Sequence, residues 1–212
     1  MIASCRPRYR RRGQRSARLA LALFAASFPG AGSAQEGSDL EYRVKAAFLY
    51  NFSKFVDWPV GVFDGTQAPL VIGILGEDPF GPILDQTVAG KTIGSRPFAI
   101  QRGLQLDELQ NVHVLFISRS ETQRLAELFG ALQGRNVLTV SEIEEFAQRG
   151  GIISFLMEQS KVRFQINPAA ADGAGLRISS KLLRLAQVVS TERPPTPLDR
   201  NPEAPLTGRR PE

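Results

Sequence analysis

Apolar and polar residues follow two different periods along residues 40–190. In residues 41–57 the apolar side chains recur at spacings of three and four, which predicts an amphipathic helix that ends before Pro59. Further along, short apolar runs predict strands at residues 70–75, 112–117 and 137–140, and an alternation of apolar and polar residues predicts one at residues 97–102. Helices are predicted between these strands, at residues 79–87, 120–132 and 141–148.

Turn and capping residues mark the ends of these segments. Gly134 is placed to end the helix that Ser120 caps. Ser141, with Glu144 three residues later, forms a capping box that opens the helix over residues 141–148. Beyond Gly150 and Gly151 the pattern predicts a hairpin of two strands and a last helix, at residues 152–157, 162–166 and 174–189.

Strands and helices therefore alternate along most of the chain. This order is typical of an α/β fold, because a helix that connects parallel strands packs back onto the sheet. We predict a three-layer sandwich with a mostly parallel central sheet, helices on both faces and a C-terminal antiparallel hairpin.

The two ends of the chain differ from this domain. Residues 1–34 hold a basic stretch, an apolar run of about ten residues and then small residues, the order of a Sec-type signal peptide cleaved after Ala34. The apolar run is too short to span a bilayer of about 30 Å as a helix. A basic arm beside a chance apolar run is the competing interpretation. Residues 191–212 are rich in proline and polar residues, which predicts a disordered tail.

The signal peptide changes the balance of charge. The whole chain carries a formal charge of +5, but 7 of its 26 basic residues and none of its 21 acidic residues lie in residues 1–34. The remainder carries 19 basic and 21 acidic residues, a net charge of −2, and gives no electrostatic reason to bind nucleic acid. Cys5 lies in the same segment, so the mature domain has no disulfide. We expect it to be periplasmic, with no membrane insertion.

Catalytic and cofactor motifs are missing from the predicted domain. His113, the single histidine, is predicted inside the strand over residues 112–117, where a structural role is favoured over catalysis in a hydrolase. A lone histidine without cysteine makes a poor metal site. Gly73 and Gly76 follow a strand, but the third glycine of a dinucleotide loop is missing. We therefore predict no catalytic, metal or cofactor site, and a protein that is not an enzyme.

A ligand crevice is the remaining candidate site. In an open α/β sheet, ligands bind beyond the carboxyl ends of the parallel strands. The residues expected there are Glu77, Asp78, Ser118, Arg119 and Ser141. The alternative is that they are only loop and capping residues.

Several segments, in the same order, resemble the YfiR family: residues 41–59, 74–81, 113–118 and 162–186. The resemblance implies a compact α/β regulator of the periplasm, often a homodimer. It implies a protein that binds and represses the periplasmic sensor domain of an inner-membrane diguanylate cyclase, and so controls cyclic-di-GMP signalling and biofilm formation. Some relatives couple repression to redox state through disulfides, which this chain cannot do without cysteine after residue 34.

Aromatic residues of the first predicted helix and its exit are the expected contacts with that partner. Tyr42, Tyr50 and Trp58 are the residues we select, since aromatic side chains often anchor interfaces. The alternative is that they pack in the core. A second function, from another class, is a periplasmic small-ligand-binding domain of a signalling system that uses the crevice.

Overall fold

The computed structural model describes residues 32–189. Its main strands are β2 (Leu70–Leu75), β3 (Thr92–Ile93), β4 (Arg96–Gly103), β5 (Val114–Ile117), β6 (Leu138–Ser141), β7 (Ile153–Glu158), β8 (Lys161–Ile166) and β10 (Gln187–Val188). Within the described residues they form one sheet in the order β10-β8-β7-β6-β5-β2-β4-β3. The five neighbouring strands β4, β2, β5, β6 and β7 run parallel to one another. Strand β8 is antiparallel to β7, and β3 is antiparallel to β4. A separate short pair joins β1 (Val56–Asp57) to β9 (Arg177–Ile178).

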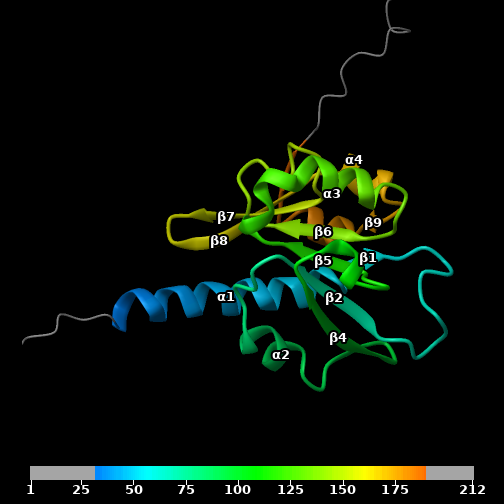
Figure 1. The fold of residues 1–212 in the computed structure, drawn as a ribbon, viewed down its shortest axis with the longest axis horizontal. Coiled ribbons are helices and arrows are strands. Elements are labelled where there is room, and N and C mark those ends of the chain that lie inside the picture. The colour runs from blue at the N-terminus through cyan, green and yellow to red at the C-terminus, as the bar shows by residue number, and fades with distance from the viewer. Residues whose placement is uncertain (1–31, 190–212) are drawn as a thin grey trace, which may run out of the picture.

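Helices cover both faces of this sheet (Figure 1). They are α1 (Gly32–Phe52), α2 (Pro82–Val88), α3 (Leu125–Leu132), α4 (Pro168–Gly173) and α5 (Ser180–Leu183), with the 3-10 turns η1 (Leu106–Glu108) and η2 (Arg119–Arg124). Together with the parallel strands and the β7–β8 hairpin, they confirm the predicted α/β sandwich.

Alternation along the strands creates two cores. On one face Ile72, Ile74 and Phe116 pack in a cluster that includes residues of α1 and α2. On the other face Leu115 and Ile117 pack beneath α3. Because both faces of the central strands are covered, their residues form continuous apolar runs, as the sequence shows.

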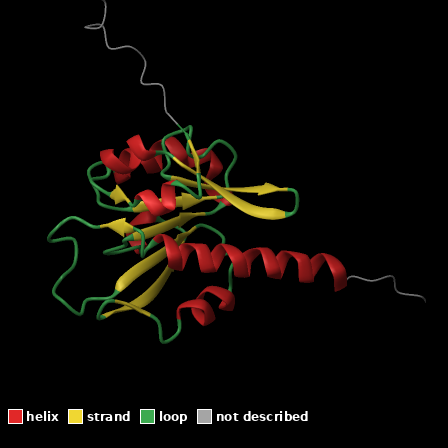
Figure 2. Cartoon of the chain, turned by 180° about the vertical axis from the view of Figure 1, so that it is seen from behind, coloured by secondary structure: helices red, strands yellow, loops and turns green. Residues whose placement is uncertain are grey.

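Helix α1 carries one apolar row from the core to the solvent. Phe52 is fully buried, and Phe48 packs against Phe155 and Phe164 of the hairpin at ring distances of 6.1 and 5.3 Å. One and two turns earlier, Val44 is 36% exposed and Leu40 is 65% exposed. The N-terminal half of α1 thus projects beyond the sheet (Figures 1 and 2).

The first helix differs from its prediction at both ends. It begins at Gly32 and ends at Phe52 instead of residue 57, because the chain turns there and Val56 pairs with Ile178. Residues 32–34 of the predicted signal peptide are the first residues of α1. The rest of that segment, and the predicted tail over residues 191–212, lie outside the described residues.

Two other helices start at different positions from those predicted. Helix α2 begins at Pro82 rather than residue 79, because the Asp78 carboxylate accepts the Phe80 N–H and holds a turn. The segment before α3 begins as the 3-10 turn η2, with Ser118 rather than Ser120 at its N-cap position. His113 directly precedes β5 instead of lying within it.

Two predicted helices are wrong. Where a helix is predicted over residues 141–148, Ser141 is the last residue of β6, and its hydroxyl donates to the Ile117 carbonyl at 2.7 Å. The residues that follow it form turns, because Glu145 has φ +55°, which interrupts a helix. The last predicted helix, over residues 174–189, is divided among β9, α5 and β10. Gly175, at φ +70°, separates this stretch from α4, and Leu185 is 71% exposed rather than buried.

Candidate functional site

A hollow of about 780 Å³ lies at the carboxyl end of the sheet. Its wall is formed by α1, by the loops after β5 and β6, and by the far end of β7. The side chains that line it include Lys45, Arg119, Glu142, Arg149, Phe155 and Met157. The hollow combines charged groups of both signs with an apolar wall, at the place where α/β sheets bind ligands.

Buried charges are paired at the edge of this hollow. Lys45 is only 1% exposed, and its ammonium group contacts the carboxylates of Glu41 and Glu142. Glu142 is 8% exposed and also forms an ion pair with Arg119, whose Nε lies 3.3 Å from Oε1 of Glu142. A charged side chain is costly to bury alone, so each of these groups depends on the others.

Tyr42 completes the network from the same helix. Its hydroxyl donates to Glu142 Oε1 at 3.1 Å, and its ring meets Phe80 edge-on at 5.5 Å. Burial and the nearby Glu142 carboxylate raise the pKa of Tyr42 to about 12. The hydroxyl therefore stays protonated and donates to Glu142 at any physiological pH.

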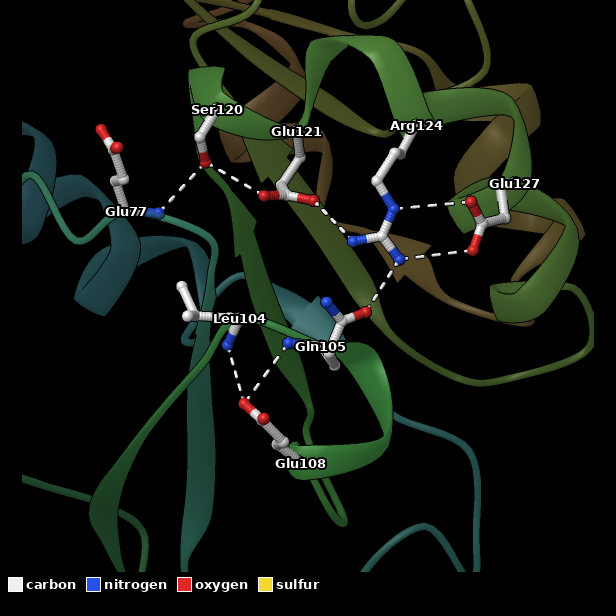
Figure 3. A network of polar contacts seen from close by, with 8 residues as sticks. All are labelled: Glu77, Leu104, Gln105, Glu108, Ser120, Glu121, Arg124 and Glu127. Carbon is white, nitrogen blue, oxygen red and sulfur yellow. Dashed lines mark hydrogen bonds and ion pairs between the residues drawn. The ribbon is translucent and has the colours of Figure 1, made fainter.

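A second polar network joins neighbouring loops at this end of the sheet (Figure 3). The Glu77 N–H donates to Ser120 Oγ at 3.1 Å, and Ser120 Oγ donates to Glu121 Oε1 at 3.1 Å. Gly76 makes this approach feasible, since it has φ +87° and a Cβ there would collide with Ser120 Oγ. The contact fixes the end of β2 against η2.

Arg124 extends this network towards β4. Its guanidinium donates to Glu121, Glu127 and Gln105, and contact with the Glu127 carboxylate raises the pKa of Arg124. Glu108 in turn accepts the N–H groups of Leu104 and Gln105 (Figure 3). Because the polar groups of this network bond to one another, the network holds the neighbouring loops together.

The five predicted crevice residues lie at the carboxyl ends of β2, β5 and β6, and of these only Arg119 lines the hollow. Asp78 pairs with Arg102 at 2.6 Å. Ser118 and Ser141 are buried, and their backbone or hydroxyl groups bond to neighbouring strands. Glu77 is exposed, with its N–H on Ser120.

The three residues predicted to contact a partner are half-buried, and their rings already contact other side chains of the domain. Tyr42 bonds to Glu142, as described above. Tyr50 packs on Phe98 at 5.3 Å and lies beneath the ammonium groups of Lys54 and Lys91. The indole N–H of Trp58 is buried and has no hydrogen-bond partner within residues 32–189.

His113 lies at the opposite, amino end of the sheet. It is 4% exposed, its Nδ1 accepts the Val71 N–H at 3.1 Å, and its ring stacks on Phe63 at 4.4 Å. Burial, with Arg96 nearby, lowers the pKa of His113 below its usual value. Residues 32–189 contain no cluster of three side chains suited to hold a metal ion.

Lys45 and Glu142 are the two buried charged residues of the hollow that the sequence analysis did not select. Glu142 could have been found, because it directly follows a strand whose carboxyl end was predicted to face a ligand. Lys45 lies in a helix beside apolar Ala46 and Leu49, and no local signal shows that its side chain is buried.

The fold and the hollow together define an α/β domain with an open, charged hollow at the carboxyl end of its sheet and a projecting first helix. A family model described as YfiR/HmsC-like matches residues 42–187. The chain belongs to the YfiR/HmsC-like family. This family is regulatory rather than catalytic, and membership points to a periplasmic regulator of a diguanylate cyclase. A search of the curated proteins finds no match. None of the helices in residues 32–189 has the length and apolar character needed to cross a bilayer.

Proposed function

We propose that this chain is a periplasmic protein that binds and represses the periplasmic sensor domain of an inner-membrane diguanylate cyclase. It would thereby control cyclic-di-GMP signalling and biofilm formation. The observation that carries the proposal is the family match, which covers residues 42–187 and so nearly all of the α/β domain. Repression of this kind requires only that the regulator binds the inactive state of the cyclase more tightly than the active one.

The projecting half of α1 supports the proposal, because it offers apolar side chains to a partner. Leu40 is 65% exposed and Val44 is 36% exposed on one face of the helix. Met157, on the hairpin that packs against α1, is 48% exposed. We name these three residues the α1 surface, and propose that the sensor domain packs on it. Tyr42, in the same part of the helix, would act indirectly by holding α1 against Glu142.

Co-purification from a membrane extract tests the partner. The tagged mature protein is the bait, and mass spectrometry identifies what it retains. We expect an inner-membrane protein with a periplasmic sensor domain and a cytoplasmic diguanylate cyclase domain. If a folded bait retains no such protein, the proposed function is wrong.

Two matched variants then test the surface. Leu40→Arg and Val44→Arg should reduce retention of the cyclase and raise its activity, because a desolvated cation would face the partner. Val60→Arg is the control, since Val60 lies in the loop after β1 and is fully exposed. Unchanged retention in all three variants would place the contact elsewhere, and Tyr50→Ala and Trp58→Ala would test the other predicted contacts.

A small-ligand-binding domain of a signalling system is the second candidate function. The observation that favours it is the hollow of about 780 Å³ with both signs of charge along its wall. A thermal-shift screen of small periplasmic metabolites tests it, because a bound ligand raises the melting temperature with concentration. Loss of the shift in Arg119→Ala would place the ligand in the hollow.

A further inference from the structure

Strand β4 leaves one side of its backbone unpaired. On its inner side, residues Phe98–Gly103 pair with β2, but on its outer side β3 reaches only Arg96 and Pro97. Within residues 32–189 no strand pairs with the outer side of residues 98–103. In Figure 1, β4 is the lowest of the labelled strands, with α2 beside it. Residues 98–103 therefore form a sheet edge that β3, the short neighbouring strand, does not cover.

Sheet edges of this kind attract another strand, because their outward N–H and C=O groups lack partners. Proteins usually blunt such edges with lysine, proline or a bulge. The hairpin at the other side of the sheet follows this rule, with Lys161 and Arg163 on β8. On β4 such residues stand only at the two ends, as Arg96, Pro97 and Arg102. The stretch between them, residues 98–101, reads Phe-Ala-Ile-Gln and is half-buried.

The two ends of this edge carry opposite charges. At one end, the guanidinium of Arg102 forms ion pairs with the carboxylates of Asp78 and Asp85 at 2.6 and 2.5 Å. Two negative charges face one positive charge there, so this end is acidic. At the end near Phe98, the ammonium groups of Lys54 and Lys91 lie over the Tyr50 ring. A shallow hollow of about 350 Å³ runs between α2 and β4, from Asp85 to Lys91.

We propose that β4 pairs antiparallel with β4 of a second copy of this chain, about a two-fold axis close to Ile100. The two sheets then become one, and the outward backbone groups of both edges are bonded. The two-fold axis sets Phe98 of each copy opposite Arg102 of the other. It also sets the acidic end of each edge opposite the basic end of the other, whereas a parallel arrangement would oppose like charges. The proposal does not depend on the cyclase as partner.

Sedimentation velocity and amide hydrogen exchange of the mature protein test this interface. We expect a monomer–dimer equilibrium, and slower exchange of the amides of residues 98–102 as the protein concentration rises. A monomer at every concentration overturns the proposal, and so does a dimer that leaves exchange at these residues unchanged. If the protein is a monomer at every concentration, the edge of β4 stays available to a strand of a different protein.

A charge reversal tests the orientation. Lys91→Glu should weaken the dimer roughly tenfold, because it replaces two symmetry-related attractions with repulsions. Adding Asp85→Lys to the same chain should restore much of the affinity. Lys161→Glu is the control, since it makes the same charge change at the opposite side of the sheet. Circular dichroism establishes that each variant is folded, and equal dimer affinity of Lys91→Glu and Lys161→Glu would overturn the two-fold arrangement.

Discussion

The two ends of the central sheet bury polar side chains in different ways. At the carboxyl end the Lys45 ammonium group and the Glu142 carboxylate pair with each other and with further groups of opposite charge. At the amino end His113 is held neutral among aromatic rings, and its Nδ1 accepts a backbone N–H. The carboxyl end should therefore be sensitive to loss of a partner, and the amino end to acid.

The largest effect should come from breaking the ion pair at the carboxyl end. Glu142→Ala leaves Lys45 buried beside Glu41 alone, and we expect the free energy of unfolding to fall by about 3–5 kcal/mol. Urea denaturation measures it. The double variant Lys45→Met, Glu142→Leu should recover much of the loss, because an apolar pair needs no counter-charge. A Glu142→Ala variant as stable as the natural protein would show that the pair is not effectively buried.

The next largest effect should come from a substitution that disrupts the close contact between the end of β2 and η2. Gly76→Ala forces a side chain to adopt φ +87° and places its Cβ against Ser120 and Glu121. Gly61→Ala is a matched control, since Gly61 has φ +89° but nothing within 4 Å of its Cβ position. We expect Gly76→Ala to be less stable than Gly61→Ala by about 1–3 kcal/mol, the usual cost of overpacking. Thermal unfolding of both variants gives the difference.

Acid should act at the amino end through His113. Its pKa is lowered in the folded protein, so the unfolded chain binds the proton more readily. The stability contributed by the neutral ring is therefore complete above about pH 6.5, the pKa of an unperturbed histidine, and falls as the pH drops through the folded pKa. Urea denaturation at several pH values measures this. His113→Asn keeps an acceptor for Val71 and should remove this part of the dependence; an identical pH profile would assign it to other groups.

The smallest effect should come from Arg124 in the network of Figure 3. Arg124→Ala removes an ion pair with Glu127, which is exposed to water, and one with Glu121, which is buried but keeps its hydrogen bond from Ser120. We expect the melting temperature to change little, and the change to vanish in high salt. A large loss that persists in high salt would instead show that Arg124 fixes the loops by packing.

The strands were predictable from sequence, and several helices were not. Buried strands such as β2 and β5 read as unbroken apolar runs, and tertiary contacts do not alter that signal. The capping box at Ser141 and Glu144 is a genuine local pattern, and the Ser141 hydroxyl accepts the Ile143 N–H as well as donating to β5. No helix follows, because Glu145 adopts a left-handed backbone conformation at φ +55°. The apolar positions of residues 174–189 suit a helix, yet β9 pairs there with β1, far away in sequence, and β10 pairs with β8.

The place of the hollow follows from the sequence better than its lining does. The rule that ligands gather at the carboxyl ends of parallel strands points to the loops after β5 and β6, and these loops line the hollow. Arg119 was selected in this way. Lys45 was not, because its burial arises from the packing of α1 across the sheet, which no local pattern in the sequence describes.

The aromatic row of α1 also has a consequence for the order in which the protein folds. Phe48 and Phe52 bury their rings against Phe155 and Phe164, which belong to strands made much later in the chain. Contacts between such distant parts slow folding, because a long loop must close before they form. While the chain is being synthesised, the first helix has no surface on which to bury this row until β8 follows. We expect folding to remain incomplete until then, and the proposed export to the periplasm would benefit from a chain that stays unfolded during synthesis.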